Sequence, residues 1–339
     1  MSLYCAIDLH SNNHVITIID DHDQKLFERR MPNKLDTTLD CLSPYQNELT
    51  GIAVESTYDW YWLVDGLMEA GYPLQLVNTA AVKQYEGIKF TNDESDSFHL
   101  AHLMRLGILP TGYIYPKAQR AIRDLLRKRG FLVHHRTALT LSAQSLHTRI
   151  TGRQASCNVI QGDHAERIYL SSYEDTNRKL EMQSNLRMIK ALHQQIIEIE
   201  KVVMNQMKLA PEFLGLKQVP GIGNILALTI ALETGDINRF AKAGNYASYC
   251  RAVTSRRESN GKKKGVGNRK NGNKYLGWAF VEAANFMVRY SDDGKRFFQR
   301  KLAQKNRAVA VKATANKLAK ACFYIMRDKA TYDAKMLFS

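Results

Sequence analysis

Short apolar runs alternate with turn-forming residues along the first hundred positions of this 339-residue chain. Leu3–Leu9 and His14–Ile19 are rich in β-branched residues and are separated by the turn-prone segment 11–13, which predicts two strands. Gln24–Arg30 is expected to complete a three-stranded meander. Asp8 then lies at the end of the first strand.

A second group of elements follows the meander. The apolar run at 51–54 ends in Glu55 and predicts a strand, with a helix over Asp59–Glu69 and another strand over Pro73–Val77. A helical stretch is expected over His99–Leu106, opened by the acidic segment 92–96. Strands that alternate with helices predict an α/β sheet at the N-terminal end of the chain.

The middle of the chain has heptad spacing that predicts two long helices. The apolar positions of the repeats are Leu125, Leu132, Leu139 and Leu146, then Ile189, Leu192, Ile196, Ile199 and Val203. Arg129 and Arg136 interrupt the first seam, and the polar segment 152–178 is expected to connect the helices. The helices could pair with each other in a plain bundle or with a second subunit in a coiled coil.

The C-terminal part returns to helical periodicity after a glycine-rich turn. Residues 218–224, QVPGIGN, are typical of a helix-hairpin-helix element, in which Gly221 and Gly223 expose backbone amides to a nucleic-acid phosphate. Helical patterns follow over Tyr275–Tyr290 and Arg296–Arg327, and the second carries a run of basic residues. These features predict a mainly helical region that binds nucleic acid.

Charge is divided between the two parts of the chain. The net charge is +15, yet residues 1–110 hold 7 Lys and Arg against 16 Asp and Glu, which leaves −9 there and +24 over 111–339. The basic part predicts binding to a polyanion that weakens steeply with salt. An acidic part on such a chain indicates carboxylates that are gathered around metal ions.

Three separate segments deliver these carboxylates. Asp8 and Glu55 end two strands, and open α/β sheets place their sites at strand carboxyl ends. Asp93 and Asp96 are spaced i, i+3 and share one face of the helix that they open. Hard divalent cations prefer oxygen ligands, so the pattern predicts a Mg²⁺ or Mn²⁺ site, although each acid alone could simply cap a helix or begin a turn.

The segment 254–277 combines two serines with dense positive charge and five glycines. We take Ser259 as the candidate nucleophile because Gly261 beside it permits close approach of a phosphate, with Ser255 and Tyr275 as rivals. The candidate nucleic-acid-binding side chains here are Arg256, Arg257, Lys262, Lys263, Lys264, Arg269, Lys270 and Lys274. The alternative is a plain binding loop without chemistry.

The sequence also limits where the protein acts. No stretch approaches the roughly 18 consecutive apolar residues of a membrane span, and the N-terminus lacks the pattern of a signal peptide. The five cysteines are scattered without CxxC or Cys/His clustering, which indicates reduced thiols and no zinc module. We therefore expect a cytoplasmic protein without a membrane partner.

These residues together resemble the DEDD-type insertion-sequence transposases, the RNA-guided bridge recombinases. The resemblance is carried by AIDLH with Asp8, AVEST with Glu55, NDESD with Asp93 and Asp96, the VPGIG stretch, and SNGKKKGVGNRKNGNKYLGWAFVEAANF at 259–286. The last of these is highly specific to one subgroup, and the matches cover essentially the whole chain in family order. Ser97 departs from the alanine that is common at that position.

The resemblance implies an architecture and a mechanism. It implies a RuvC-like domain with the RNase H fold over 1–112, a helical coiled-coil region over 113–210 and a helical transposase domain over 211–339. It also implies that Ser259 forms a covalent phosphoserine link to DNA, that a noncoding guide RNA pairs with donor and target DNA, and that the protein works as a dimer or tetramer. The serine and carboxylates are expected to form a composite site.

Two other functions agree with the same residues. In a metal-dependent structure-specific nuclease, the carboxylates would activate water and Ser259 would only bind phosphate, which predicts cleavage without a protein adduct. In a non-enzymatic packaging protein, binding would survive the loss of Asp8 and Glu55. The acidic residues argue against the second alternative, and only the family resemblance separates recombination from hydrolysis.

Overall fold

The computed structural model describes residues 2–57, 59–82, 93–254, 257–265 and 271–338. The described residues divide into two compact units, one that comprises residues up to 117 and the other the residues from 118 onward, apart from Asn271. Each unit has its own hydrophobic core and is described by itself. The three-part division expected from the sequence stays a prediction.

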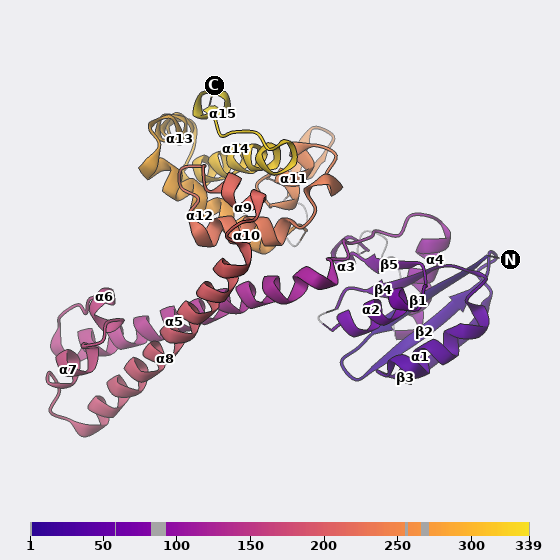
Figure 1. Cartoon of the computed structure of the whole chain (residues 1–339), viewed down its shortest axis with the longest axis horizontal. Coiled ribbons are helices and arrows are strands. Elements are labelled where there is room, and N and C mark those ends of the chain that lie inside the picture. Colours follow the sequence, from indigo (N-terminus) through magenta and orange to yellow (C-terminus); the bar gives the residue numbers. More distant parts are fainter. Residues whose placement is uncertain (1, 58, 83–92, 255–256, 266–270, 339) are drawn as a thin grey trace. The chain divides into compact units, whose positions relative to one another are not determined.

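The first unit contains a five-stranded mixed sheet (Figure 1). Its strands are β1 (Leu3–Leu9), β2 (Asn13–Ile19), β3 (Lys25–Pro32), β4 (Leu49–Glu55) and β5 (Leu74–Val77), in the order β3-β2-β1-β4-β5. The first three pair antiparallel, whereas β1, β4 and β5 are parallel. The predicted meander and both later strands are therefore present, and the mixed sheet is consistent with a RuvC-like domain at a coarse level.

Helices cover both faces of this sheet because strand side chains alternate between them. One face packs Cys5, Ile7 and Ile52 against α1 (Leu35–Leu42) and α2 (Tyr61–Glu69). The other face carries small residues, Ala6 and Ala53, beneath α4 (Asp93–Arg105). Short elements complete the unit: η1 (Ser43–Tyr45) and α3 (Thr79–Val82).

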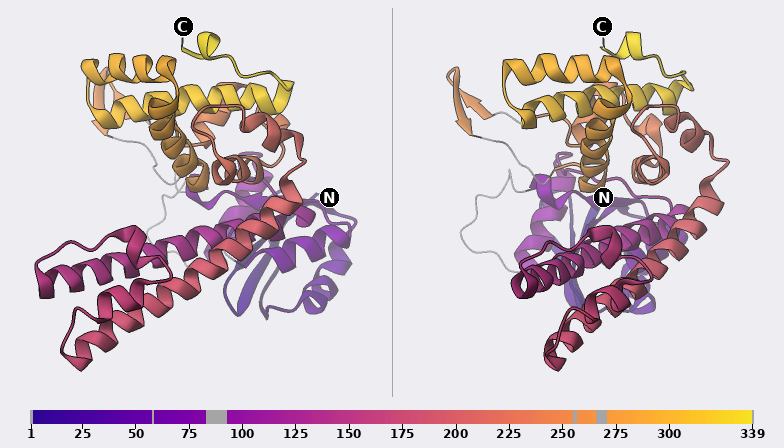
Figure 2. Two further views of the ribbon diagram at one scale, coloured as in Figure 1. Left: turned by 60° about the vertical axis from the view of Figure 1, so that its left-hand side comes forward. Right: turned by 90° about the vertical axis from the view of Figure 1, so that its left-hand side faces the viewer.

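Two long helices of the second unit form a hairpin (Figures 1 and 2). They are α5 (Lys117–Thr151) and α8 (Thr176–Met207), and the connection between them holds α6 (Cys157–Ile160) and α7 (Ala165–Leu170). Both helices predicted from the heptads are present, and they lie beside each other within one chain. Pairing with a second subunit stays a prediction.

The seam between these helices is not uniformly apolar. Leu125 and Leu132 pack against the main core of the unit, whereas Leu139 and Leu146 pack in a separate cluster with the α6–α7 connection. Ion pairs and hydrogen bonds span the stretch between: Arg129 Nε donates to Glu200 at 2.7 Å, and Arg136 Nη1 lies 2.8 Å from His193 Nδ1. The arginines that interrupt the heptads therefore bind across the seam and fix its register.

The main core of the second unit is helical. It is built from α9 (Pro211–Leu216), α10 (Asn224–Thr234), η3 (Ile237–Arg239), α11 (Ala243–Tyr249), α12 (Lys274–Tyr290), α13 (Asp292–Gln304), α14 (Arg307–Asp328) and α15 (Ala334–Phe338). Helix α10 is buried along almost its whole length and lies at the centre of this core. The predicted Arg296–Arg327 stretch is two helices, because α13 ends at Gln304 and Asn306 caps α14 by accepting from Val309 N.

The serine segment is more ordered than a glycine-rich loop. Two short strands, β6 (Arg257–Ser259) and β7 (Lys262–Gly265), form an antiparallel hairpin. Ser259 pairs with Lys262 in this hairpin. The two residues between them, Asn260 and Gly261, have φ angles of 50° and 68°. Asn-Gly with two positive φ values is the favoured two-residue hairpin turn, a signal that the interpretation of Gly261 as a phosphate contact overlooked.

No helix in the described part of the chain is both long enough and apolar enough to cross a lipid bilayer.

Two glycines of the second unit should respond oppositely to an added methyl group. A Cβ on Gly221 would lie 2.6 Å from Met287 N in α12, at φ +91°, whereas a Cβ on Gly130 within α5 meets nothing within 4 Å. We expect Gly221→Ala to destabilise the unit by at least about 2 kcal/mol and Gly130→Ala to stabilise it by about 0.5–1 kcal/mol. Denaturant unfolding of both variants beside the parent measures this, and a neutral Gly221→Ala would contradict the close packing.

Candidate active site

The carboxyl ends of two neighbouring strands bring the first two carboxylates together. β1 and β4 are parallel and paired, with Ile7 opposite Val54, so Asp8 and Glu55 follow as the next residues on each strand. Side chains alternate, and both acids therefore lie on the same face as Ala6 and Ala53, the face that α4 covers. Asp8 is only 3% exposed.

Helix α4 supplies the other two carboxylates from its first turn. Three contacts fasten the helix along the β2–β3 side of the sheet. Arg105 makes a bidentate pair with Asp23 at 2.7 and 2.6 Å, and His102 Nδ1 lies 2.9 Å from the same carboxylate. Midway, the buried Ser97 and Thr17 hydroxyls are 2.7 Å apart. Ser97 therefore makes a buried hydrogen bond that an alanine at this position could not make.

The gathered carboxylates change the acidity of Glu55. Burial of Glu55, a hydrogen bond with Asp8, and the negative charges of Asp8 and Asp96 together raise the pKa of Glu55 to about 8. Asp93 behaves oppositely, because hydrogen bonding to Arg30 lowers its pKa despite partial burial, and His10 adds to the effect. All four acids predicted from the sequence thus belong to one electrostatic neighbourhood.

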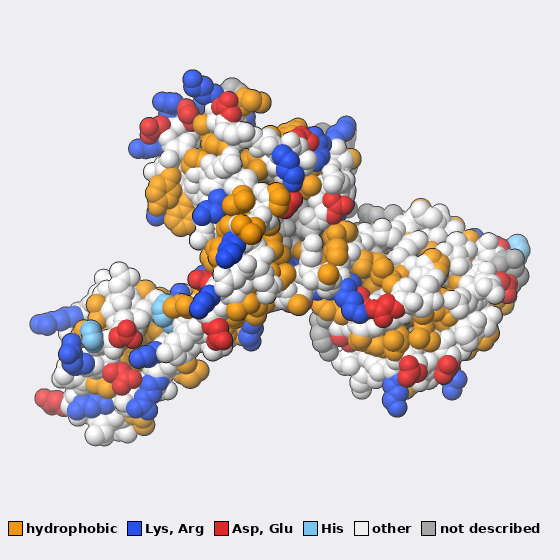
Figure 3. Space-filling view, in the orientation of Figure 1, with side chains coloured by type: hydrophobic (Ala, Val, Ile, Leu, Met, Phe, Trp, Pro, Cys, Tyr) orange, Lys and Arg blue, Asp and Glu red, His pale blue; other side chains and the backbone are white. Residues whose placement is uncertain are grey.

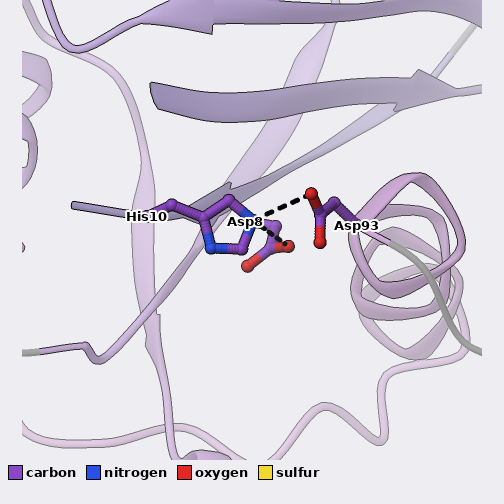
Figure 4. A group of neighbouring side chains, drawn as sticks. All are labelled: Asp8, His10 and Asp93. Atoms are coloured by element: carbon purple, nitrogen blue, oxygen red, sulfur yellow. Dashed lines mark ion pairs between the residues drawn. The ribbon is translucent and has the colours of Figure 1, made fainter. Parts of the chain in front are cut away.

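Two residues of this site were missed in the sequence. Figure 4 shows the His10 ring facing both the Asp8 and the Asp93 carboxylates, and its Nε2 lies 3.3 Å from the first and 3.2 Å from the second. Arg30 on β3 also pairs with Asp93. His10 had a signal, since it lies two residues after Asp8 and strand side chains repeat every two. No sequence signal indicated Arg30, because its position next to Asp93 depends on the register between β2 and β3.

The donor set suits a hard divalent cation. One ligand atom each from Asp8, His10 and Asp93 lies within 4.8 Å of the others, and Glu55 adjoins Asp8. Carboxylate oxygens are the ligands that Mg²⁺ prefers, and a cation here would oppose the burial and the negative charges that raise the pKa of Glu55. Asp8, His10 and Asp93 therefore have ligand atoms close enough to share a cation, and the predicted ligand set of Asp8, Glu55, Asp93 and Asp96 stays a prediction.

The basic segment is described only in part. Ser259 is exposed on β6 next to the hairpin turn, and Lys262 and Lys264 are exposed on β7. Arg257 and Lys263 have a described backbone only. Arg256, Arg269, Lys270 and the rival Ser255 lie outside the described residues.

The remaining predicted contacts lie on helices of the second unit. Lys274 is exposed at the first position of α12, and the neighbouring Tyr275 packs under the Arg127 guanidinium at 4.6 Å from its ring centre. Gly223 is exposed at the start of α10, whereas Gly221 is pressed against α12. The structure thus gives Gly221 a packing role and leaves Gly223 accessible.

Comparison with known proteins agrees with this arrangement. Residues 5–150 match the DEDD-type IS110 model described as "Transposase", and residues 215–299 match the "Transposase IS116/IS110/IS902 family" model. The first match contains all four carboxylates, and the second contains the hairpin turn, Ser259 and α12. The chain belongs to the IS110 family of transposases.

Two relatives of this IS110-family chain are named as transposases. The protein y4qE of Sinorhizobium fredii is 26% identical over 232 residues, which cover 67% of this chain and 55% of the relative. A family 20 transposase of Pseudomonas aeruginosa is 25% identical over 300 residues, which cover 83% of this chain and 85% of the relative. The IS110-family chain therefore spans about half the length of the first relative and most of the second.

The raised pKa of Glu55 predicts a pH-dependent stability of the first unit. A carboxyl whose folded pKa, about 8, exceeds its unfolded value stabilises the fold at low pH, and this contribution is lost as pH rises toward 8. In EDTA, we expect the melting temperature of this unit to fall between about pH 5 and pH 8.5. Added Mg²⁺ should reverse the fall.

Calorimetry of Glu55→Gln tests the assignment. This variant should flatten the pH dependence, while Glu48→Gln, an exposed residue just before the other end of β4, should leave it unchanged. An unaltered pH dependence of the melting temperature in Glu55→Gln would show that titration of this carboxyl does not cause the fall in stability.

Proposed function

We propose that this protein is a DNA transposase that cleaves and rejoins donor and target DNA through a covalent phosphoserine intermediate, guided by a noncoding RNA. The observation that carries the proposal is the convergence of Asp8, Glu55, Asp93 and Asp96 from three separate segments. Membership of the IS110 family supports the reaction class. The RuvC-like, helical and serine-bearing parts at 1–112, 113–210 and 211–339 belong to the same proposal.

The carboxylate site would take Mg²⁺ or Mn²⁺. When bound, the ion would lower the cost of negative charge on the phosphate and on the leaving oxygen. The chain's own residues arrange this site beforehand: α4 is fastened to the sheet at Asp23 and Thr17, and its acidic first turn lies beside the strand ends. Positioning by a rigid helix and sheet keeps the ligands together despite their repulsion.

Ser259 would supply the nucleophile. Its hydroxyl oxygen attacks the phosphorus of a DNA phosphodiester, a serine–phosphate bond forms, the bond to one deoxyribose oxygen breaks, and the serine proton ends on that leaving oxygen. Attack by the hydroxyl of another DNA strand reverses these steps and restores the serine, so the exchange needs no ATP. The exposed position of Ser259 at a tight hairpin turn suits contact with a DNA backbone.

The surrounding charge supports a nucleic-acid partner. Lys262 and Lys264 are exposed on the strand opposite Ser259, and the segment 111–339 carries a net charge of +24. Figure 3 shows Lys and Arg side chains spread over the visible face of the second unit. A composite site requires that Ser259 meet the carboxylates of its own or a partner subunit in a dimeric or tetrameric assembly.

A covalent-trapping assay tests the mechanism. Purified protein is mixed with element-flanking RNA, labelled donor and target DNA and Mg²⁺, and the products are resolved on a denaturing gel. We expect a labelled protein adduct that falls at least about a hundredfold in Ser259→Ala, as for loss of a nucleophile, and in Asp8→Ala. Ser255→Ala is the matched control and should keep the adduct.

Each other outcome has a distinct meaning. An adduct that persists in Ser259→Ala and disappears in Ser255→Ala would move the nucleophile four residues. Cleaved DNA without an adduct, unaffected by Ser259→Ala, would make the protein a hydrolytic nuclease and overturn the mechanism. Binding without cleavage at any metal concentration would favour a non-enzymatic role.

A further inference from the structure

A cavity of the second unit lies apart from the serine hairpin and is formed by three helices. Its volume is about 420 Å³, and it is bordered by α5, α10 and α12. Each helix contributes one face: Arg127, Phe131 and His134 on α5, Ile225, Thr229 and Glu233 on α10, and Lys274, Tyr275 and Trp278 on α12. Pockets of roughly 300–1,000 Å³ commonly hold small ligands.

The floor of this cavity is fixed by a buried carboxylate. Glu233 is 3% exposed and accepts two hydrogen bonds from Arg127, at 2.6 and 2.7 Å, and a third from Asn273 at 2.7 Å. Asn273 in turn caps α12 by accepting from Tyr275 N and Leu276 N. Because one carboxylate ties all three helices, the cavity is formed before any ligand arrives.

Two of the aromatic side chains that line the cavity are exposed to solvent. Phe131 is 53% exposed on α5 and Trp278 is 44% exposed on α12. Exposed aromatic side chains beside a cavity mark binding surfaces more often than single scattered apolar residues do. Aromatic rings can stack with a planar ligand, and Phe131 also contacts the His135 ring, with ring centres 4.2 Å apart.

Cations accompany the aromatic rings. Lys128 Nζ lies 4.7 Å from the centre of the Phe131 ring, and Lys274 Nζ lies 5.0 Å from that of Tyr275. Proteins that bind single-stranded nucleic acid combine aromatic platforms, on which bases stack, with cations that follow the phosphates. A duplex offers no unstacked base to such a cavity.

We propose that this cavity holds an unpaired base of a nucleic-acid strand, stacked on Trp278 and Phe131, with its flanking phosphates at Lys128 and Lys274. The inference rests on the proposed function, since an RNA-guided exchange of DNA strands must pass through unpaired nucleotides. It adds a binding site whose lining residues include neither the four carboxylates nor Ser259. RNA and DNA share the chemistry that this site reads.

Tryptophan emission measures occupancy of the site directly. The full-length protein is titrated in EDTA with labelled single strands of about 12 nucleotides, oligo(dT) in one arm and oligo(U) in the other. We expect quenching of Trp278, since Trp60 and Trp62 belong to the first unit. Trp278→Phe should keep the affinity, measured by anisotropy, and lose that quenching, and Trp278→Ala should weaken binding about tenfold.

Two further variants separate occupancy from general charge. Gly130 borders the cavity, and a Cβ there meets nothing within 4 Å, so Gly130→Leu should leave the fold intact and obstruct the site. We expect it to weaken single-strand binding as Trp278→Ala does. Tyr290→Ala, a ring 70% exposed at the far end of α12, is the matched control and should bind as the parent does.

Preference for one oligonucleotide identifies the strand that occupies the site, and either preference supports the proposal. Quenching that persists in Trp278→Phe, or unchanged affinity in both Trp278→Ala and Gly130→Leu, would overturn it. Quenching that follows protein concentration alone would assign the surface to a second copy of the chain and would also overturn it. Because the assay excludes metal and measures no cleavage, its failure is distinct from failure of the covalent adduct.

Discussion

The docking of α4 on the sheet is the constraint on which the candidate active site depends. Burial of Glu55, its hydrogen bond with Asp8 and the negative charges of Asp8 and Asp96 raise its pKa, which shows that the cluster disfavours the charged form of this side chain. The helix that brings two of them is held at its far end by the Arg105–Asp23 pair, at its centre by Ser97 and Thr17, and along its length by small residues, Ala6 and Ala53, beneath it. The stability of these contacts is what sustains an unfavourable cluster of charge, as is common where a protein prepares a metal site.

The second unit uses buried and half-buried polar groups to fix geometry that apolar packing alone would leave adjustable. Glu233 joins α5, α10 and α12 through Arg127 and Asn273, and the Arg129–Glu200 and Arg136–His193 contacts set the register of α5 against α8. Hydrogen bonds to a buried carboxylate are directional and costly to leave unmade, so they specify one arrangement of helices. The register of the α5–α8 hairpin is consequently fixed between two apolar clusters, one at its α6–α7 end and the other at the helical core.

The division of charge along the chain now has a structural basis. The acids that matter lie at one edge of a sheet, in the unit that the DEDD-type transposase model matches, whereas the second unit displays exposed lysines on the serine hairpin and on α12. Exposed lysines attract a polyanion, whereas clustered carboxylates repel one unless a cation offsets their charge. Under the proposed function, this need for a cation is a physical reason for an acidic and a basic unit to share one chain.

The sequence by itself determined the elements and the acidic residues. Period-two apolar runs gave the strands, heptads gave both long helices, and strand-end acids indicated the site, because these signals are local in the chain. The sequence did not determine which strands are neighbours, and so it left open whether Asp8 meets Glu55. It also missed Arg30, whose contact with Asp93 follows from the β2–β3 register, and the hairpin that orders Ser259. Tertiary structure alone decided that Arg127, Glu233 and Trp278, separated by tens of residues, border one cavity, because contacts between distant segments depend on the packing of the whole unit.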